Sequence, residues 1–236
     1  MFGIKTQVLR YFTKKCVPHL INKTKITELM LHFKTDEFGH QASTQDADLG
    51  YGWIHYGLIR QQKPQKILCI GSRHGFIPAT LAQACKDNGS GLVDFVDAGF
   101  DDADAGGWTG VGYWKTEAGK NCFSEFNLEK YINLYVKTTQ QFVTTFPERS
   151  YDYIYIDGDH SLNGVLLDFK LLFPKLKKDG YIVFHDICVR GNKPEGEYGV
   201  WKLWKILGKK FKTIEINFDG SGLGIMQNKS LTEIQA

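Results

Sequence analysis

Cysteine is scarce in this chain and is poorly placed for cross-linking or for binding zinc. There are five cysteines among 236 residues, and no two of them form a Cys-x-x-Cys pair. Disulfide frameworks need paired cysteines, and structural zinc sites need closely spaced ones. The sequence therefore argues against both, and Cys69 and Cys188, which lie inside apolar runs, are expected to be small buried hydrophobic residues.

Long apolar runs and a strong net charge are also absent. No apolar run reaches the roughly 18 residues of a membrane-spanning helix, which argues against an integral membrane segment. Residues 1–20 hold no continuous apolar segment like that of a secretory signal, so we expect a cytoplasmic protein. The formal net charge of +3 is too small to indicate nucleic-acid binding, and we expect no nucleic-acid partner.

What the chain does contain fits one α/β domain with an appendage. Hydrophobic residues make up 42% and charged residues 23%, as in ordinary globular proteins. Residues 1–60 are expected to form an N-terminal helical extension, in which Ile4, Val8 and Phe12 recur at helical spacing beside basic residues. This stretch either lies on a membrane surface or packs against the chain's own domain or a second copy, and the second alternative is favoured. The main domain is expected to span residues 61–236.

From residue 66 onward, apolar runs alternate with helical patterns, which predicts a parallel sheet with helices packed on it. The expected strands are 66–70, 91–97, 132–136, 153–156 and 181–184, and the expected helices are 51–62, 77–85, 162–176 and 200–207. Pro174 is expected to loosen the last turn of the third of these helices, and Gly180 to stop it.

The carboxyl-terminal part of the chain has a different pattern. Ile214, Ile216 and Phe218 alternate with polar residues, residues 219–222 have turn chemistry, and residues 223–226 are apolar again. Two strands joined by so short a loop must be antiparallel. The predicted fold class is therefore α/β, with a doubly wound, mostly parallel sheet that carries a terminal antiparallel hairpin.

Two predicted strands end abruptly in acid and imidazole. The fourth strand runs into Asp157 and His160, and the fifth runs into His185 and Asp186. In an open α/β sheet, ligands bind outside the carboxyl ends of the strands. If the two strands are neighbours, Asp157 and Asp186 reach one hard cation at oxygen–metal distances of about 2.1 Å. A neutral His160 beside that cation serves as a general base.

A second candidate site follows the first strand, where residues 71–75 form a turn that begins and ends with glycine. Such a turn lets the backbone approach a ligand and aims helix N–H groups at it, although a simple packing turn has the same pattern. Asp97 ends the second strand, where an acid grips a ribose hydroxyl in dinucleotide-binding sheets. Together these features favour an adenosine-containing cofactor, with Asp94, inside the strand, as a weaker ribose partner.

These motifs resemble those of the class I S-adenosylmethionine-dependent methyltransferases. In detail, the chain is similar to the metal-dependent O-methyltransferases of the group that includes macrolide-sugar methyltransferases and cephalosporin-hydroxylase-like proteins. The resemblance covers roughly residues 51–228 and is most specific at residues 156–160, 176–180 and 183–186. It implies a seven-stranded Rossmann-like sheet and transfer of a methyl group from S-adenosylmethionine (SAM) to a hydroxyl of a small molecule or a sugar.

The resemblance also implies a role for each matching residue. Asp157 and Asp186 are implied to bind a divalent metal, which is magnesium in that family, and His160 is implied to be the catalytic base. His185 stands where the sugar methyltransferases have an acid. It is either a third metal ligand, which shifts the preference toward manganese, iron or zinc, or a group behind the ligands. The implied cofactor-binding residues are Gly71, Ser72, Gly75, Asp97, Thr139 and Asp157.

Several features leave other functions open. The family's first motif has an acid where this chain has Cys69, and often a glycine where it has Arg73. A non-catalytic module that binds a nucleotide or cofactor is therefore one alternative. A nicotinamide-dependent oxidoreductase on a similar sheet is another, although the terminal hairpin argues against it. The insertion 99–126, with Trp108 and Trp114, is either an aromatic lid over the substrate or a structural flap. Assembly into a homo-oligomer also stays open.

Overall fold

The computed structural model describes residues 23–35, 40–100, 112–193, 196–218 and 220–230. The helical pattern predicted around Ile4 and Phe12 and the predicted lid residue Trp108 lie outside these ranges. Within them, no helix combines the length and the apolar character that crossing a membrane requires.

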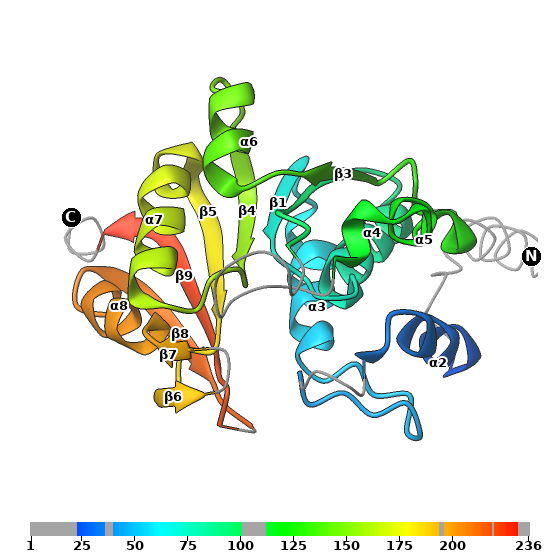
Figure 1. Cartoon of the computed structure of the whole chain (residues 1–236), viewed down its shortest axis with the longest axis horizontal. Helices are drawn as coiled ribbons and strands as arrows, with labels where there is room; N and C mark the ends of the chain where they lie inside the picture. The colour runs from blue at the N-terminus through cyan, green and yellow to red at the C-terminus, as the bar shows by residue number, and fades with distance from the viewer. Residues whose placement is uncertain (1–22, 36–39, 101–111, 194–195, 219, 231–236) are drawn as a thin grey trace, which may run out of the picture.

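A sheet of seven strands forms the centre of the molecule, in the order β3-β2-β1-β4-β5-β9-β8 (Figure 1). Strands β1 to β5 pair in parallel, whereas β9 is antiparallel to both of its neighbours, β5 and β8. The predicted parallel sheet with a terminal antiparallel hairpin is thus confirmed. The strands are β1 (Lys66–Ile70), β2 (Leu92–Asp97), β3 (Ile132–Val136), β4 (Tyr151–Ile156), β5 (Leu176–His185), β8 (Phe211–Ile216) and β9 (Leu223–Ser230), and a separate hairpin pairs β6 (Gly191–Lys193) with β7 (Gly196–Tyr198).

Helices cover both faces of this sheet, as a doubly wound fold requires. Helices α2, α3 and α4 pack on one face, and α6, α7 and α8 pack on the other (Figure 1). Met30, Tyr51 and Ile59, from α2 and α3, are buried in the same core cluster as residues of β1 and β2. These contacts join the N-terminal helices to the sheet, and the domain boundary at residue 60 stays a prediction. The helices are α2 (Lys23–His32), α3 (Tyr51–Gln62), α4 (Phe76–Asn88), α5 (Glu117–Asn121), α6 (Thr139–Thr145), α7 (Leu162–Leu172) and α8 (Val200–Leu207).

Strand β1 shows how the sequence divides its residues between the two layers. Successive side chains of a strand point to opposite faces. Leu68 and Ile70 pack in the cluster of α6 to α8, whereas Ile67 and Cys69 pack in the cluster of α2 to α4. All four are buried, because a central parallel strand is covered on both sides. Burial raises the pKa of the Cys69 thiol well above its ordinary value, so Cys69 is the buried hydrophobic residue that its apolar context predicts.

The helix predicted to reach residue 176 is shorter than expected. Helix α7 ends at Leu172, one 3₁₀ turn follows (η4, Phe173–Lys175), and Leu176 already begins β5. Pro174 lies inside that turn, where its missing N–H and its ring prevent the helix from continuing. The prediction that Gly180 stops the helix is therefore wrong, because Gly180 lies within β5.

The described part of the insertion contributes to the core. Trp114 is 2% exposed, donates a hydrogen bond from Nε1 to the Ser72 carbonyl oxygen at 2.9 Å, and stacks on Phe123. It also meets Phe95 of β2 edge to face, with 4.6 Å between the ring centroids. The interpretation of Trp114 as a lid aromatic that stacks on a substrate is therefore wrong, because its indole is packed beneath the turn that follows β1.

Asp94, in the middle of β2, belongs to a structural cluster. It is 2% exposed and accepts hydrogen bonds from Asn133 Nδ2 at 3.1 Å, Arg149 Nη1 at 2.8 Å and the Tyr151 hydroxyl at 2.9 Å. Because protein donors occupy its carboxylate, Asp94 is not available to a cofactor ribose.

Replacing Arg149 with methionine is expected to destabilise the fold by about 1–3 kcal/mol, because it removes a charged donor from a buried carboxylate. The Arg149 side chain is 33% exposed, so solvent screening keeps the effect below that of a fully buried pair. Urea denaturation measures the change. Arg60→Met, which removes a looser contact of 3.7 Å to Asp87, is the matched control and is expected to lose less. An unchanged unfolding midpoint for Arg149→Met would contradict this role.

Candidate active site

The carboxyl ends of β1, β4 and β5 bring the predicted site residues together. The last residue pair between β1 and β4 and the last pair between β4 and β5 share Ile156. The residues that come next, Gly71, Asp157 and His185, therefore lie at the same edge of the sheet. The two acid-tipped strands, β4 and β5, are neighbours, which is the condition for a shared cation site.

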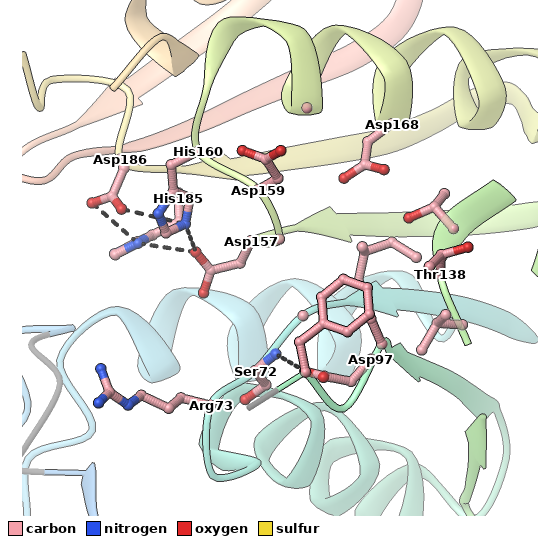
Figure 2. Close-up of a pocket in the computed structure, with 18 of the residues that line it drawn as sticks. Ser72, Arg73, Asp97, Thr138, Asp157, Asp159, His160, Asp168, His185 and Asp186 are labelled. Atoms are coloured by element: carbon pink, nitrogen blue, oxygen red, sulfur yellow. Dashed lines mark hydrogen bonds and ion pairs between the residues drawn. The ribbon is translucent and has the colours of Figure 1, made fainter. Parts of the chain in front are cut away.

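Asp157, His185 and Asp186 face one another across this edge. His185 Nδ1 lies 3.4 Å from Asp157 Oδ1 and 3.3 Å from Asp186 Oδ1. Successive residues of a regular strand point to opposite faces, which would separate His185 from Asp186. Asp186 leaves the strand with a φ of 59°, a left-handed conformation that aspartate tolerates better than most residues. Its carboxylate thereby turns toward the same cluster (Figure 2).

His160 completes the cluster from the loop between β4 and α7. Its Nε2 lies 3.0 Å from Asp157 Oδ1 and 3.5 Å from Asp186 Oδ2. The next residue, Ser161, is the N-cap of α7 and accepts a backbone N–H of the first helical turn at 3.0 Å, which fixes where the loop ends. Tyr198 of β7 stacks on the imidazole, with 5.2 Å between the ring centroids. The Tyr198 ring thus covers the imidazole, while the two carboxylates face its Nε2.

Opposite charges outweigh burial in setting the pKa values of this cluster. Burial alone would lower the pKa of both imidazoles, but Asp186 and Asp157 raise the pKa of His185 well above its ordinary value, and Asp157 raises that of His160. Burial alone would raise the pKa of Asp157, but His185 and His160 hold it well below its ordinary value. Asp157 is therefore a stable carboxylate, and each imidazole is a more basic proton acceptor than a free histidine.

A layer of rings, which the sequence analysis did not identify, adjoins the cluster. The His40 ring is 4.5 Å from the His185 ring, between centroids. His55 of α3 is fully buried and meets Tyr155 edge to face at 4.6 Å. Burial, followed by the nearby histidines, lowers the pKa of His55 to about 3, so this imidazole is neutral at physiological pH. Tyr155 in turn donates a hydrogen bond to Asp157 Oδ2 at 3.0 Å, which orients the carboxylate.

The turn after β1 places the predicted cofactor residues beside the cluster. Gly71 has a φ of 74°, and a Cβ there would lie 2.2 Å from the Asp157 carbonyl oxygen, so only glycine fits. The Ser72 N–H donates to Asp97 Oδ2 at 3.1 Å, and the other Asp97 oxygen accepts a backbone N–H at 2.8 Å. Burial raises the pKa of Asp97 above its ordinary value, and these backbone donors oppose the rise.

Most of the predicted site residues line one cavity of about 870 Å³. Gly75 is not among its lining residues. It begins α4 with a φ of 97°, and a Cβ there would lie 2.8 Å from the Trp114 ring, so Gly75 serves close packing. The predicted residues that do line the cavity are Gly71, Ser72, Asp97, Thr139, Asp157, His160, His185 and Asp186.

Asp168, which the sequence analysis missed, points into the same cavity (Figure 2). It is 6% exposed and lies on the buried side of α7 with Val165 and Leu172. Burial raises the pKa of its carboxyl group to about 6, and the nearby side chain of Thr139, at the start of α6, opposes the rise. An acid at position 168 interrupts the apolar stripe of this helix, and that interruption is the signal that the sequence offers.

The donor atoms at the strand ends suit a divalent cation. One ligand atom from each of Asp157, His160 and Asp186 lies within 4.8 Å of the others, and His185 Nδ1 faces the same carboxylates. Carboxylates mixed with imidazoles are typical of manganese, iron and zinc sites, whereas magnesium prefers oxygen ligands. The residues therefore fit a metal, and their composition favours a transition metal.

Comparisons with known proteins point to one family. A family model described as a methyltransferase domain matches residues 68–187, from within β1 to the residue after Asp186. This match covers half of the chain and includes the whole acid and imidazole cluster. No curated protein matches the chain.

Solved structures of the same fold cover almost the whole chain. An O-methyltransferase from Bacillus cereus, in complex with SAH, is 14% identical with a TM-score of 0.64, over 94% of this chain and 97% of that one. SAH-bound PaMTH1, a methyltransferase from Podospora anserina, is 15% identical with a TM-score of 0.61, over 97% of both chains. The O-methyltransferase TomG from Streptomyces achromogenes, in complex with SAM, is 16% identical with a TM-score of 0.58, over 94% and 95%. At these identities the likeness establishes the fold alone.

Proposed function

This chain belongs to the methyltransferase domain family, and we propose that it is a SAM-dependent O-methyltransferase for a hydroxyl of a small molecule or sugar, assisted by a divalent metal. The observation that carries the proposal is a single cavity in which Gly71 and Asp97 adjoin the cluster of Asp157, His160 and Asp186. Proteins of the same fold in complex with SAH or SAM, two of them O-methyltransferases, support the choice of donor and reaction.

The methyl donor is proposed to bind across the turn that follows β1. The lack of a side chain at Gly71 lets a ligand approach the backbone, and Phe76, the first residue of α4, lines the same cavity. Asp97 is oriented by the Ser72 N–H and is proposed to accept hydrogen bonds from the ribose hydroxyls. Because burial raises the pKa of Asp97, two hydroxyl donors would stabilise the carboxylate that the cavity otherwise disfavours.

Asp157 and Asp186, with His185 as a third ligand, are proposed to hold the metal. A divalent cation in this place lowers the pKa of a hydroxyl that binds to it. Tyr155, supported by the buried His55, fixes the orientation of the Asp157 carboxylate through its hydrogen bond. Ligand groups held in this way need little reorganisation.

His160 is proposed to be the general base. It takes the proton of the acceptor hydroxyl while the acceptor oxygen bonds to the methyl carbon and the bond between sulfur and methyl breaks. The products are the methyl ether, S-adenosylhomocysteine (SAH) and a protonated imidazole. Asp157, 3.0 Å away, stabilises the positive charge that His160 gains. Most of the remaining acceleration comes from holding donor and acceptor in line.

Calorimetric titration with SAH tests the donor site. We expect the wild-type protein to bind SAH, and Asp97→Leu to bind it about 10- to 150-fold more weakly, because charged hydrogen bonds to the ribose are lost. Asp152→Asn, at the amino end of β4, removes an acid from the opposite edge of the sheet and is expected to leave the affinity unchanged. Absence of SAH binding to the wild-type protein would overturn the proposed enzyme and leave a module that binds something else.

A further inference from the structure

We propose that the solvent-facing side of α8 docks on an anionic lipid bilayer. This side of the helix and the cations next to it form the α8 surface, which consists of Arg190, Trp201, Lys202, Lys205, Ile206, Lys209 and Lys210. The inference goes beyond the proposed function and does not depend on it, because it concerns a partner of the protein and not the reaction.

Helix α8 carries apolar side chains on both of its sides. One side is buried against the sheet and consists of Val200, Leu203, Trp204 and Leu207. The other side holds Trp201, Lys202, Lys205 and Ile206, which share it because residues three and four apart lie on one face of a helix. Ile206 is 51% exposed, although a surface helix usually has polar residues there. The two apolar residues on this side therefore serve neither the core nor the cavity.

Three cations gather on the indole of Trp201. Arg190 Cζ lies 5.0 Å from the ring centroid, Lys205 Nζ lies 5.1 Å away and Lys202 Nζ 5.6 Å away. The attraction of each cation to the ring offsets part of the repulsion among them. Among the ion pairs of the described residues, only that of Lys202 with Glu197 includes one of these three cations. Like charges held this close favour the binding of an anionic partner.

The positive charge of the α8 surface is large for this protein. Lys209 and Lys210 follow the end of the helix and are both exposed. The surface thus has five cations, with Glu197 as the acid that pairs with one of them, whereas the formal net charge of the whole chain is only +3. Positive charge is therefore concentrated here and not spread evenly over the molecule.

An anionic bilayer matches this mixture of charge and apolar surface. Acidic headgroups attract lysine and arginine, while an exposed apolar side chain enters the boundary between headgroups and acyl chains. A soluble phosphate would use the cations and leave Ile206 without a contact. A nucleic acid would need an open aromatic face on which to stack its bases, and cations already lie on the Trp201 ring.

The α8 surface adjoins the wall of the candidate active site. Trp201 Nε1 donates a hydrogen bond to the Tyr198 carbonyl oxygen at 3.2 Å. Tyr198 lines the cavity and stacks on His160. Figure 1 shows α8 beside β6 and β7, the hairpin that carries Tyr198. A bilayer bound to this surface would therefore lie next to the wall that Tyr198 forms.

Co-sedimentation of the full-length protein with vesicles tests the inference. The wild-type protein is expected to bind vesicles of phosphatidylcholine mixed with phosphatidylglycerol at least about tenfold more tightly than vesicles of phosphatidylcholine alone, because each cation near an anionic surface contributes about fivefold. Added salt is expected to weaken the binding. A wild-type protein that binds both kinds of vesicle equally, or neither, would overturn the inference.

Two substitutions on the helix separate the charged and apolar contributions. Lys205→Gln is expected to weaken binding to the mixed vesicles about fivefold. Ile206→Gln is expected to weaken it about three- to tenfold, because half of this side chain is available for burial. Glutamine supports a helix at least as well as isoleucine, so both variants are expected to keep the wild-type unfolding midpoint in urea.

Matched controls come from helices in the other part of the molecule. Lys120→Gln removes a cation from α5, and Leu31→Gln removes an apolar side chain that is 63% exposed on α2. Both controls are expected to bind the mixed vesicles as the wild-type protein does. Wild-type binding by the double variant Lys205→Gln and Ile206→Gln would exclude α8 as the docking surface. A short DNA duplex that displaces the protein from vesicles at equal phosphate concentration would make this a general polyanion site and likewise overturn the proposal.

Discussion

Replacing His160 with alanine is expected to lower the rate of methyl transfer by about 10²- to 10⁴-fold, the range for loss of a general base. The imidazole lies 3.0 Å from Asp157 and 3.5 Å from Asp186, and alanine leaves the acceptor hydroxyl without a proton acceptor there. SAH affinity is expected to stay unchanged, because the donor site is built from other residues. Single-turnover rates with methyl-labelled SAM, and an acceptor found by screening simple glycosides and phenols, provide the measurement.

Glutamine at the same position separates proton transfer from hydrogen bonding. His160→Gln keeps an N–H donor for Asp157 but cannot accept a proton at neutral pH, so its rate is expected to be as low as that of alanine. Burial lowers the pKa of His160, but Asp157 and Asp186 raise it more, to above its ordinary value. Since the base must be neutral, the wild-type rate rises as pH increases through that pKa, and both variants lack this rise. His32→Gln, whose imidazole pairs with Glu125, is the control. A wild-type rate in His160→Gln would exclude the base role.

The sheet could be predicted because buried parallel strands consist of continuous apolar runs. Strands β1 and β3 begin and end at the predicted residues, and the short turn before residue 223 forced the antiparallel hairpin. The junction at Pro174 was not predictable from periodicity, since the apolar pattern continues through Leu176 as if the helix did. The boundary between α7 and β5 is set by the pairing of Leu176 with Tyr151 of β4. No local sequence pattern predicts that contact.

The candidate site was predictable where it coincides with strand ends. Asp157 follows an apolar run directly and Asp186 follows one after a single residue, so sheet geometry brings both to the same edge. The left-handed backbone that turns the Asp186 carboxylate into the cluster has no signal in the sequence. His55 of α3 forms a hydrogen bond with Tyr153, which is 98 positions away in the sequence. No local pattern near either residue predicts this contact. Asp168 was visible as an acid in an apolar stripe, but helical periodicity does not say which cavity that stripe faces. The missing information was in each case the packing of helices onto the sheet.

Replacing Asp186 with asparagine is expected to lower the rate by about 10²- to 10³-fold and to weaken Mn²⁺ binding, because a metal contribution of several kcal/mol depends on its carboxylate. Asparagine also tolerates the left-handed backbone at this position, so the loop is kept. Asp159→Asn removes one charge from the same cavity without touching the cluster and is the matched control. Calorimetric titration with Mn²⁺ measures binding, and methyl-transfer rates with and without EDTA measure the consequence. Activity that survives both EDTA and Asp186→Asn would rule out metal assistance.

Because the proposed ligands include an imidazole, the affinity for Mn²⁺ is also expected to depend on pH. An imidazole must be neutral to bind a metal, yet Asp186 and Asp157, acting against burial, raise the pKa of His185 well above its ordinary value. Metal binding therefore displaces a proton, and the affinity for Mn²⁺ rises with pH. Titration in buffers of different ionisation enthalpy counts the displaced protons, and we expect about one for His185 as a ligand. His185→Asn is expected to release about one proton fewer than the wild-type protein, while Asp157 and Asp186 still bind Mn²⁺ and any remaining release comes from His160. Binding without proton release in the wild-type protein would place His185 behind the ligands and make the site one of oxygen donors.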